Sequence, residues 1–215
     1  MKIKDIYYYY GIPENLQNHM LRVAGMGAFI LDHWHGPSID GDSLIRVLLL
    51  HDMGNLVKII EHYEDPRFQA MRDKYIALYG ADDHVVSEAI GREVGLREEE
   101  IAMMSQKIFM KNEQTMNRED SSSFLVKIGA YCDQRVAPDG ILSLRDRMEE
   151  GKLRYRDRPG TSFNHPQTDR MIECAYKIEE QVMQYCDILP EEITNESIAP
   201  YIEKLKTYEI KKEEQ

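Results

Sequence analysis

The most informative segment of the chain comprises residues 44–54, which read LIRVLLLHDMG. Its first seven residues contain a single polar side chain. A helix without a polar face is buried on all sides, so the segment predicts a core helix that ends or bends at Gly54, with His51 and Asp52 at its buried end. An ionised aspartate among leucines is destabilising unless a cation or several hydrogen-bond donors compensate it. We therefore expect Asp52 to have such a partner.

Two further polar residues occupy inward positions of apolar helices. His19 lies on the apolar stripe of a helix expected over residues 14–34, and Asp133 lies near the end of another over residues 124–134. Taken singly, they are typical of a hydrogen-bonded core histidine and a capping aspartate. With the histidine–aspartate pair they supply two neutral nitrogens and two carboxylate oxygens, which suit one divalent transition metal (Fe, Mn, Ni, Co or Zn), or Mg. Two carboxylates cancel the charge of such an ion. The predicted metal ligands are His19, His51, Asp52 and Asp133.

Apolar side chains recur at intervals of three and four residues over most of the chain, which predicts helices and an all-α fold class. Asp40 or Asp42 is expected to cap the core helix, and Ser121–Ser123 to cap the helix that carries Asp133. Besides the helices already named, the expected ones cover residues 66–79, 82–94, 97–109, 142–150, 168–187 and 191–212.

The chain is expected to form one helical domain with an extension. Residues 1–150 make the part that holds the metal ligands, and residues 151–215 make an arginine-rich link and C-terminal helices that pack on the same domain. The apolar faces of those helices need burial, either on the bundle or in a homodimer. The tyrosine run at residues 7–10 is the one strand-like pattern, and it is too short to build a sheet.

The composition excludes several classes of protein. The 215 residues carry a net charge of −11, so the surface repels polyanions and duplex nucleic acid is not an expected partner. The longest run without a polar side chain, residues 23–31, is far shorter than the roughly 20 residues of a membrane span. The first ten residues show no export signal, and three cysteines make no disulfide framework. We expect a cytoplasmic protein without membrane contact.

The order H…HD…D on apolar helices resembles the HD-domain superfamily of metal-dependent phosphohydrolases over about residues 14–150. The HDMGN segment at 51–55, the YGxDxH pattern at 79–84 and the DxRxxPDG pattern at 133–140 are similar to a subgroup of predicted HD hydrolases. The resemblance implies an HD-domain-like helical bundle with a C-terminal helical extension, whose four predicted ligands bind the ion. It also implies an enzyme that cleaves a small phosphate ester, a nucleotide or related metabolite, with metal-activated water.

Other polar residues acquire roles if the ion binds a phosphate ester. Asp52, by contacting both ion and water, doubles as the general base. Lys58, Arg22 and Arg135 are expected to bind phosphate, and Lys58 also to act in catalysis, because charge spreads over the phosphoryl oxygens during transfer. A long cationic side chain on a helix surface is also typical of a solvated residue.

His84 and Glu88 lie four residues apart, on one face of an expected helix. They predict a proton relay or a leaving-group acid at the substrate, or else a solvated or capping histidine. In two-metal relatives a second extra histidine is expected within residues 101–110, which contain none, so one metal is predicted. Residues 145–158 carry six Lys or Arg against four Asp or Glu, which indicates guanidinium groups near a phosphate or an ion-paired surface loop.

Two other functions stay open on the sequence alone. A noncatalytic helical module, in which a metal or a retained ligand stabilises the fold or signals to a partner, is consistent with the missing histidine and the acidic surface. An iron oxygenase needs both extra histidines and therefore fits least well. The expected partner of the enzyme is a small phosphorylated substrate.

Overall fold

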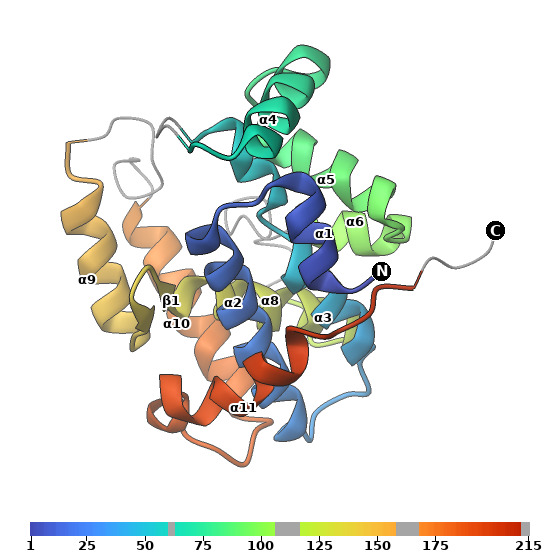
Figure 1. Cartoon of the computed structure of the whole chain (residues 1–215). Helices are drawn as coiled ribbons and strands as arrows, with labels where there is room; N and C mark the ends of the chain where they lie inside the picture. The colour runs from blue at the N-terminus through green and yellow to red at the C-terminus, as the bar shows by residue number, and fades with distance from the viewer. Residues whose placement is uncertain (60–62, 106–116, 158–167, 212–215) are drawn as a thin grey trace.

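The computed structural model describes residues 1–59, 63–105, 117–157 and 168–211, and over these residues the fold is all-α, as expected (Figure 1). A short antiparallel hairpin pairs Val136 with Ile141. Within the described ranges, no helix combines the length and the apolar character of a membrane span. The elements are α1 (Ile3–Tyr10), α2 (Glu14–Asp32), α3 (Gly41–Leu50), the 3₁₀ helix η1 (Met53–Val57), α4 (Pro66–Tyr79), α5 (Asp83–Val94), α6 (Glu98–Ser105), α8 (Ser121–Arg135), β1 (Val136–Ala137), β2 (Gly140–Ile141), α9 (Leu144–Arg154), α10 (Thr168–Met183), η4 (Pro190–Glu192) and α11 (Asn195–Leu205).

Helix α2 lies at the centre of the molecule, with α3, α8 and α11 packed around it (Figure 1). Two of its glycines allow close neighbours. A Cβ at Gly27 would lie 2.5 Å from Leu48 Cδ1 of α3, and one at Gly25 would lie 2.7 Å from Ile202 Cγ1 of α11. An added methyl group would push either side chain aside. The glycines therefore set the position of α2, the helix that carries His19, against its neighbours.

Helix α3 is buried throughout after its first turn, as its lack of a polar face predicted. Every residue from Ser43 to Leu50 is buried, including Arg46, whose Nη2 donates to the Gly95 carbonyl at 2.9 Å. Asp40 is the N-cap, because its Oδ1 accepts the Ser43 backbone N–H at 3.1 Å. The core helix thus has the cap and the burial that its sequence predicts.

The C-terminal helices cover the same bundle. Helix α10 packs against α8 and α9, and α11 packs against α2. The inward face of α10 includes Ile178 and Val182, which are buried. The two ends of the described chain also meet, since the Ile210 N–H donates to the Met1 carbonyl at 2.9 Å. The apolar faces of these helices are therefore covered largely within one chain.

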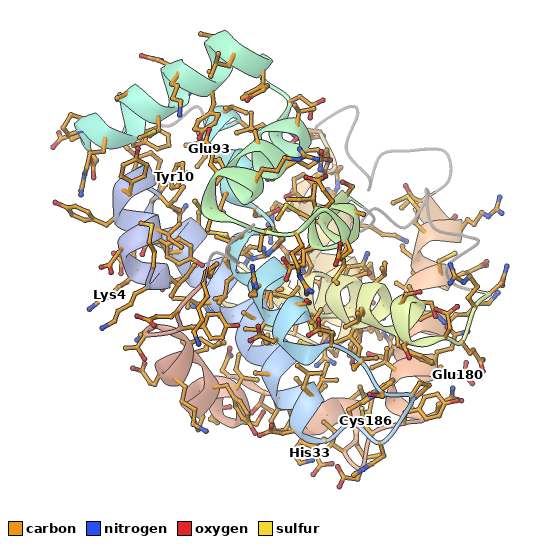
Figure 2. All side chains as sticks on the ribbon, turned by 90° about the vertical axis from the view of Figure 1, so that its right-hand side faces the viewer. Lys4, Tyr10, His33, Glu93, Glu180 and Cys186 are labelled. Carbon is orange, nitrogen blue, oxygen red and sulfur yellow. The ribbon has the colours of Figure 1, made fainter. Side chains whose placement is uncertain are left out.

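The tyrosine run belongs to helix α1, which was not predicted, and it builds no sheet, as expected. Ile3, Ile6, Tyr7 and Tyr10 are buried, and their spacing of three, one and three residues is that of one helix face. This period appears once the two isoleucines before the run are included. The Tyr10 hydroxyl donates to Glu93 Oε2 at 3.0 Å and so joins α1 to α5 (Figure 2).

Several expected element boundaries and caps also differ from the structure. Residues 191–212 are not one helix, because the cap at Thr194 starts a separate one, α11. Asp120 rather than the serines caps α8, accepting the Ser123 N–H at 3.0 Å. Helix α9 runs to Arg154 and takes up part of the expected link. Beyond Ser105, the rest of the helix expected at 97–109 lies outside the described residues.

Candidate metal centre

The four predicted metal ligands lie together, as the sequence indicated. One ligand atom from each of His19, His51, Asp52 and Asp133 lies within 4.8 Å of all the others. His19 Nε2 is 3.2 Å from Asp133 Oδ1 and 3.5 Å from Asp52 Oδ2. His51 Nε2 is 3.4 Å and 3.7 Å from the same two atoms. These residues are 114 positions apart at the extremes, and the fold brings them into one cluster.

Four elements position these side chains. His19 projects from α2, His51 follows the last residue of α3, Asp52 precedes η1, and Asp133 lies in the last turn of α8. The His51 side chain is 2% exposed, and its Nδ1 lies 2.7 Å from the Leu48 carbonyl oxygen. Because a carbonyl only accepts, Nδ1 carries a proton, and Nε2 is the nitrogen that faces the cluster. Such a hydrogen bond fixes the ring and tautomer of a metal-binding histidine.

The donor set and its spacing fit one divalent cation. Zinc, for example, binds histidine nitrogen and carboxylate oxygen at about 2.0–2.2 Å, so two ligands of one tetrahedral ion lie about 3.4 Å apart. The four nitrogen–oxygen distances in the cluster, 3.2 to 3.7 Å, bracket that separation. Two carboxylates neutralise a divalent ion, and imidazole with carboxylate is a set that transition metals accept. The cluster can therefore hold a metal ion.

The side chains themselves favour positive charge at this place. Burial lowers the pKa of His19, but hydrogen bonds and charges from Asp133 and Asp52 outweigh it and raise that pKa to about 9. Burial raises the pKa of Asp133, yet the hydrogen bonds from His19 and His51 hold it well below its usual range. Two ionised carboxylates thus draw a proton onto His19, and a metal ion competes for the same nitrogen.

We expect metal binding to release about one proton per chain near pH 7.5, because the ion displaces the proton of His19. Affinity should rise about tenfold per pH unit up to about pH 9 and then level off. In the metal-free protein the raised pKa stabilises the fold fully below pH 6.5, and this contribution is lost as the pH rises through 9. Calorimetric titration of Zn²⁺ in buffers of different ionisation enthalpy measures the proton count, and a count of zero would contradict this expectation.

A cavity of about 660 Å³ opens beside the cluster, and His19, Asp52 and Asp133 line it. The other lining residues come from η1, α2, α5, α8, α9, α10 and the hairpin region. Small-molecule sites have volumes of about 300–1,000 Å³. These three partly buried residues therefore face a space that is large enough for a small molecule.

Lys58 and His84, two of the other predicted site residues, line the same cavity. Lys58 Nζ lies 2.6 Å from Asp83 Oδ1, so an ion pair anchors this half-exposed side chain. His84 lies in the first turn of α5, where its backbone N–H donates to the N-cap Asp82 at 3.0 Å. Asp82 rather than His84 is therefore the cap of α5, and the His84 side chain reaches the cavity wall.

Arg22, Glu88 and Arg135 do not line the cavity, contrary to prediction. Arg22 Nη1 donates to the Pro138 carbonyl at 2.6 Å and holds the turn between β1 and β2. Glu88 accepts a hydrogen bond from Ser105 Oγ at 2.6 Å and so joins α5 to α6. For Arg22 and Glu88, spacing along a helix indicated a face shared with His19 or His84 but not the neighbour that each side chain meets.

Arg135 is buried and stabilises the fold. Its side chain is 3% exposed, and it donates to the Tyr131 hydroxyl at 2.6 Å and to the carbonyls of Pro190 and Ile193 at 3.2 and 3.3 Å. Two residues along a helix correspond to a rotation of about 200°. Arg135 therefore points away from the face of Asp133 and ties α8 to the segment before α11.

Arg147 and Arg154 of α9 line the cavity. Both also pair with Glu150, at 2.9 Å in the case of Arg147. The ion-paired interpretation is therefore confirmed for these two arginines, whereas guanidinium groups near a phosphate stay a prediction. The excess of Lys and Arg in this segment was the sequence feature that indicated these arginines. The packing of α9 determines which of them face the cavity.

Comparison of the chain with protein-family models, with curated proteins and with solved structures found no match. Function is therefore inferred from the four-residue cluster, from the cavity beside it and from the charges on the cavity wall.

Proposed function

We propose that this protein is a metal-dependent phosphohydrolase of the HD-domain type, which cleaves a small phosphate ester such as a nucleotide or a related metabolite. The observation that carries this proposal is the cluster of two histidines and two aspartates at the wall of the 660 Å³ cavity. The all-α bundle around the cluster is consistent with the resemblance. Lys58 and two arginines of α9 add positive charge to the same wall.

Hydrolysis adds water across the ester: a bond forms from the water oxygen to phosphorus, the ester P–O bond breaks, and the leaving oxygen takes a proton. A divalent cation supplies Lewis acidity for this reaction, because it lowers the pKa of water towards about 7 and polarises a phosphoryl oxygen. Asp52, whose side chain is 16% exposed at the cavity wall, is our proposed general base. His84 is the proposed proton donor to the leaving oxygen, and Lys58 balances charge on the phosphoryl group.

The proposal is tested with protein loaded with Mn²⁺, Co²⁺ or Ni²⁺ and assayed on phosphomonoesters, phosphodiesters and nucleotides. Asp52→Asn is expected to lower kcat by about 10²–10⁴-fold, because it removes the general base and one ligand charge. Asp187→Asn is the matched control. Asp187 also contacts two histidines, His33 at 2.7 Å and His35 at 3.2 Å, but it lies outside the cluster and the cavity. This variant should keep wild-type turnover.

A metal-loaded wild type that is inert towards all three classes of ester would overturn the proposal and would favour a noncatalytic metal-stabilised module. An unchanged turnover of the Asp52→Asn variant would show that hydrolysis does not depend on this cluster. Circular dichroism of each variant establishes that the helical fold is retained before the rates are compared.

A further inference from the structure

The charged residues on the cavity wall form an acidic group and a basic group. Within the described part of the chain, the acidic lining residues are Asp52 and Asp133, and both belong to the metal cluster. The basic lining residues are Lys58, Arg147 and Arg154. A divalent ion cancels the two carboxylates, so the loaded cavity has an excess of positive charge. In a chain with a net charge of −11, this local reversal favours an anionic ligand.

Arg147 and Arg154 lie seven residues apart on α9, close to two helical turns, and therefore share one face. Glu150 lies between them and pairs with both: Arg147 Nη1 donates to Oε2 at 2.9 Å, and Arg154 Nε donates to Oε1. Glu150 is absent from the cavity lining. It thus orients both guanidinium groups and offsets part of their positive charge. We call these three residues the α9 clamp.

Arg147 is enclosed and lies within electrostatic reach of the metal cluster. Its side chain is 14% exposed, against 30% for Arg154, and its Nε donates to the Val136 carbonyl at 3.3 Å. Burial lowers the pKa of the Arg147 guanidinium, while the charges of Glu150 and Asp133 act in the opposite direction. A partly desolvated guanidinium binds an anion more strongly than a solvated one. A ligand in the cavity would therefore be within reach of both the α9 clamp and the four-residue cluster.

A second part of the cavity wall is apolar. Tyr155 lines the cavity, and its ring centroid lies 5.5 Å from Arg154 Cζ. Aliphatic, thioether and aromatic side chains suit an apolar or aromatic group of a ligand. The wall thus offers contacts for an anion and for an apolar body within one cavity. Its aliphatic and thioether residues are Leu16, Ile59, Val136, Pro138, Met148, Met171 and Ile172.

Building on the proposed hydrolase function, we propose that Arg147 and Arg154 bind the phosphate of the substrate, and that this substrate is a phosphate monoester of a compact apolar or aromatic group. A monoester carries about two negative charges near neutral pH, whereas a diester carries one. Two guanidinium groups match a dianion, since a guanidinium group has five N–H donors and can contact phosphate oxygens while it also pairs with Glu150. Glu150 is a positioning residue that keeps both groups in place.

Binding rather than turnover tests this assignment. Protein loaded with Mn²⁺ is titrated calorimetrically with phenylphosphonate, a non-hydrolysable mimic of such a monoester. Arg154→Gln is expected to weaken binding about tenfold to a hundredfold, since it removes charged hydrogen bonds to the anion. Arg145→Gln is the matched control, because Arg145 lies on the same helix, is 79% exposed and pairs with Glu149 away from the cavity. This control should bind like the wild type.

A second measurement uses the unmodified sequence and needs no variant to fold. Phenylglyoxal labels arginines, and bound phenylphosphonate is expected to protect Arg147 and Arg154 while Arg145 still reacts, as read by peptide mass spectrometry. Absence of binding to the wild type, equal affinity of Arg154→Gln, or absence of protection would each overturn the clamp.

The outcomes also separate the clamp from the proposed hydrolase function. Protein that binds phenylphosphonate through the clamp but hydrolyses no ester upholds the clamp and overturns the hydrolase. Protein that hydrolyses monoesters with a KM unchanged by Arg154→Gln upholds the hydrolase and overturns the clamp.

Discussion

Replacing His19 by alanine is expected to leave the protein without stoichiometric metal, whereas the wild type is expected to bind about one ion per chain. His19 Nε2 lies within 3.5 Å of carboxylate oxygens of both Asp133 and Asp52, so the change removes one ligand of four. Loss of an outer-shell partner alone weakens metal binding about 10–100-fold, and loss of a ligand should exceed that. The His19 side chain is 23% exposed, against 2% for His51, so this change disturbs the core less.

Elemental analysis after dialysis gives the metal content, and thermal unfolding with and without Zn²⁺ gives a second readout. An ion at 100 times its Kd stabilises a protein by about 2.7 kcal/mol, so the wild-type Tm should rise and that of His19→Ala should not. His33→Ala is the control, because His33 caps the C-terminal end of the same helix and its Nδ1 lies 2.7 Å from Asp187 Oδ1. His33 lies near Cys186, at the opposite end of the molecule from Tyr10 and Glu93 (Figure 2). Full metal retention by His19→Ala would remove the proposed site.

Gly54→Ala is expected to destabilise the fold by about 3 kcal/mol, the upper part of the usual range for overpacking. A Cβ at Gly54 would lie 2.0 Å from the Asp83 carbonyl oxygen and 2.5 Å from the Ser87 nitrogen. Both are backbone atoms of α5, so a helix has to move rather than a side chain. The Gly54 N–H also donates to Ser87 Oγ at 2.9 Å. Because Asp52 lies two residues before this contact, metal affinity should fall as well.

For a chain of this size the expected loss corresponds to a decrease in Tm of about 6–12 °C. Gly129→Ala is the matched control, since it is a helical glycine whose added Cβ would meet Leu44 and Leu48 at an ordinary 3.6 Å. Alanine is favoured over glycine inside a helix by about 1 kcal/mol, so this variant should be neutral or stabilised. An unchanged Tm for Gly54→Ala would show that η1 and α5 are not held as closely as these distances require.

Elements with a strong apolar period were predictable, and elements that depend on their neighbours were not. The α3 segment is apolar on all sides and is buried on all sides. Helix α1 was missed because its four tyrosines hide a period that depends on Ile3 and Ile6. The small hairpin at residues 136–141 has two residues in each strand, which is too few for an alternating pattern to be visible. Its pairing is a product of the turn and of the packing around it.

The same distinction holds for the site. A buried carboxylate requires a compensating charge wherever the chain folds, so Asp52 and the other three ligands were recognisable from residue type and inward position. Phosphate contacts were assigned by closeness in sequence, and there Arg135 failed because it lies two residues and about 200° from Asp133 on its helix. Arg147 reaches the cavity from another helix altogether.

By itself, the sequence determined that the chain forms helices and that two histidines and two aspartates lie at inward positions or ends of apolar helices, because helical period and the desolvation of charge are properties of the residues alone. Tertiary structure decided which cations share the cavity with those four residues. A helix specifies the direction of each side chain relative to its own axis, but the packing of α9 and α10 against α8 determines what that side chain meets.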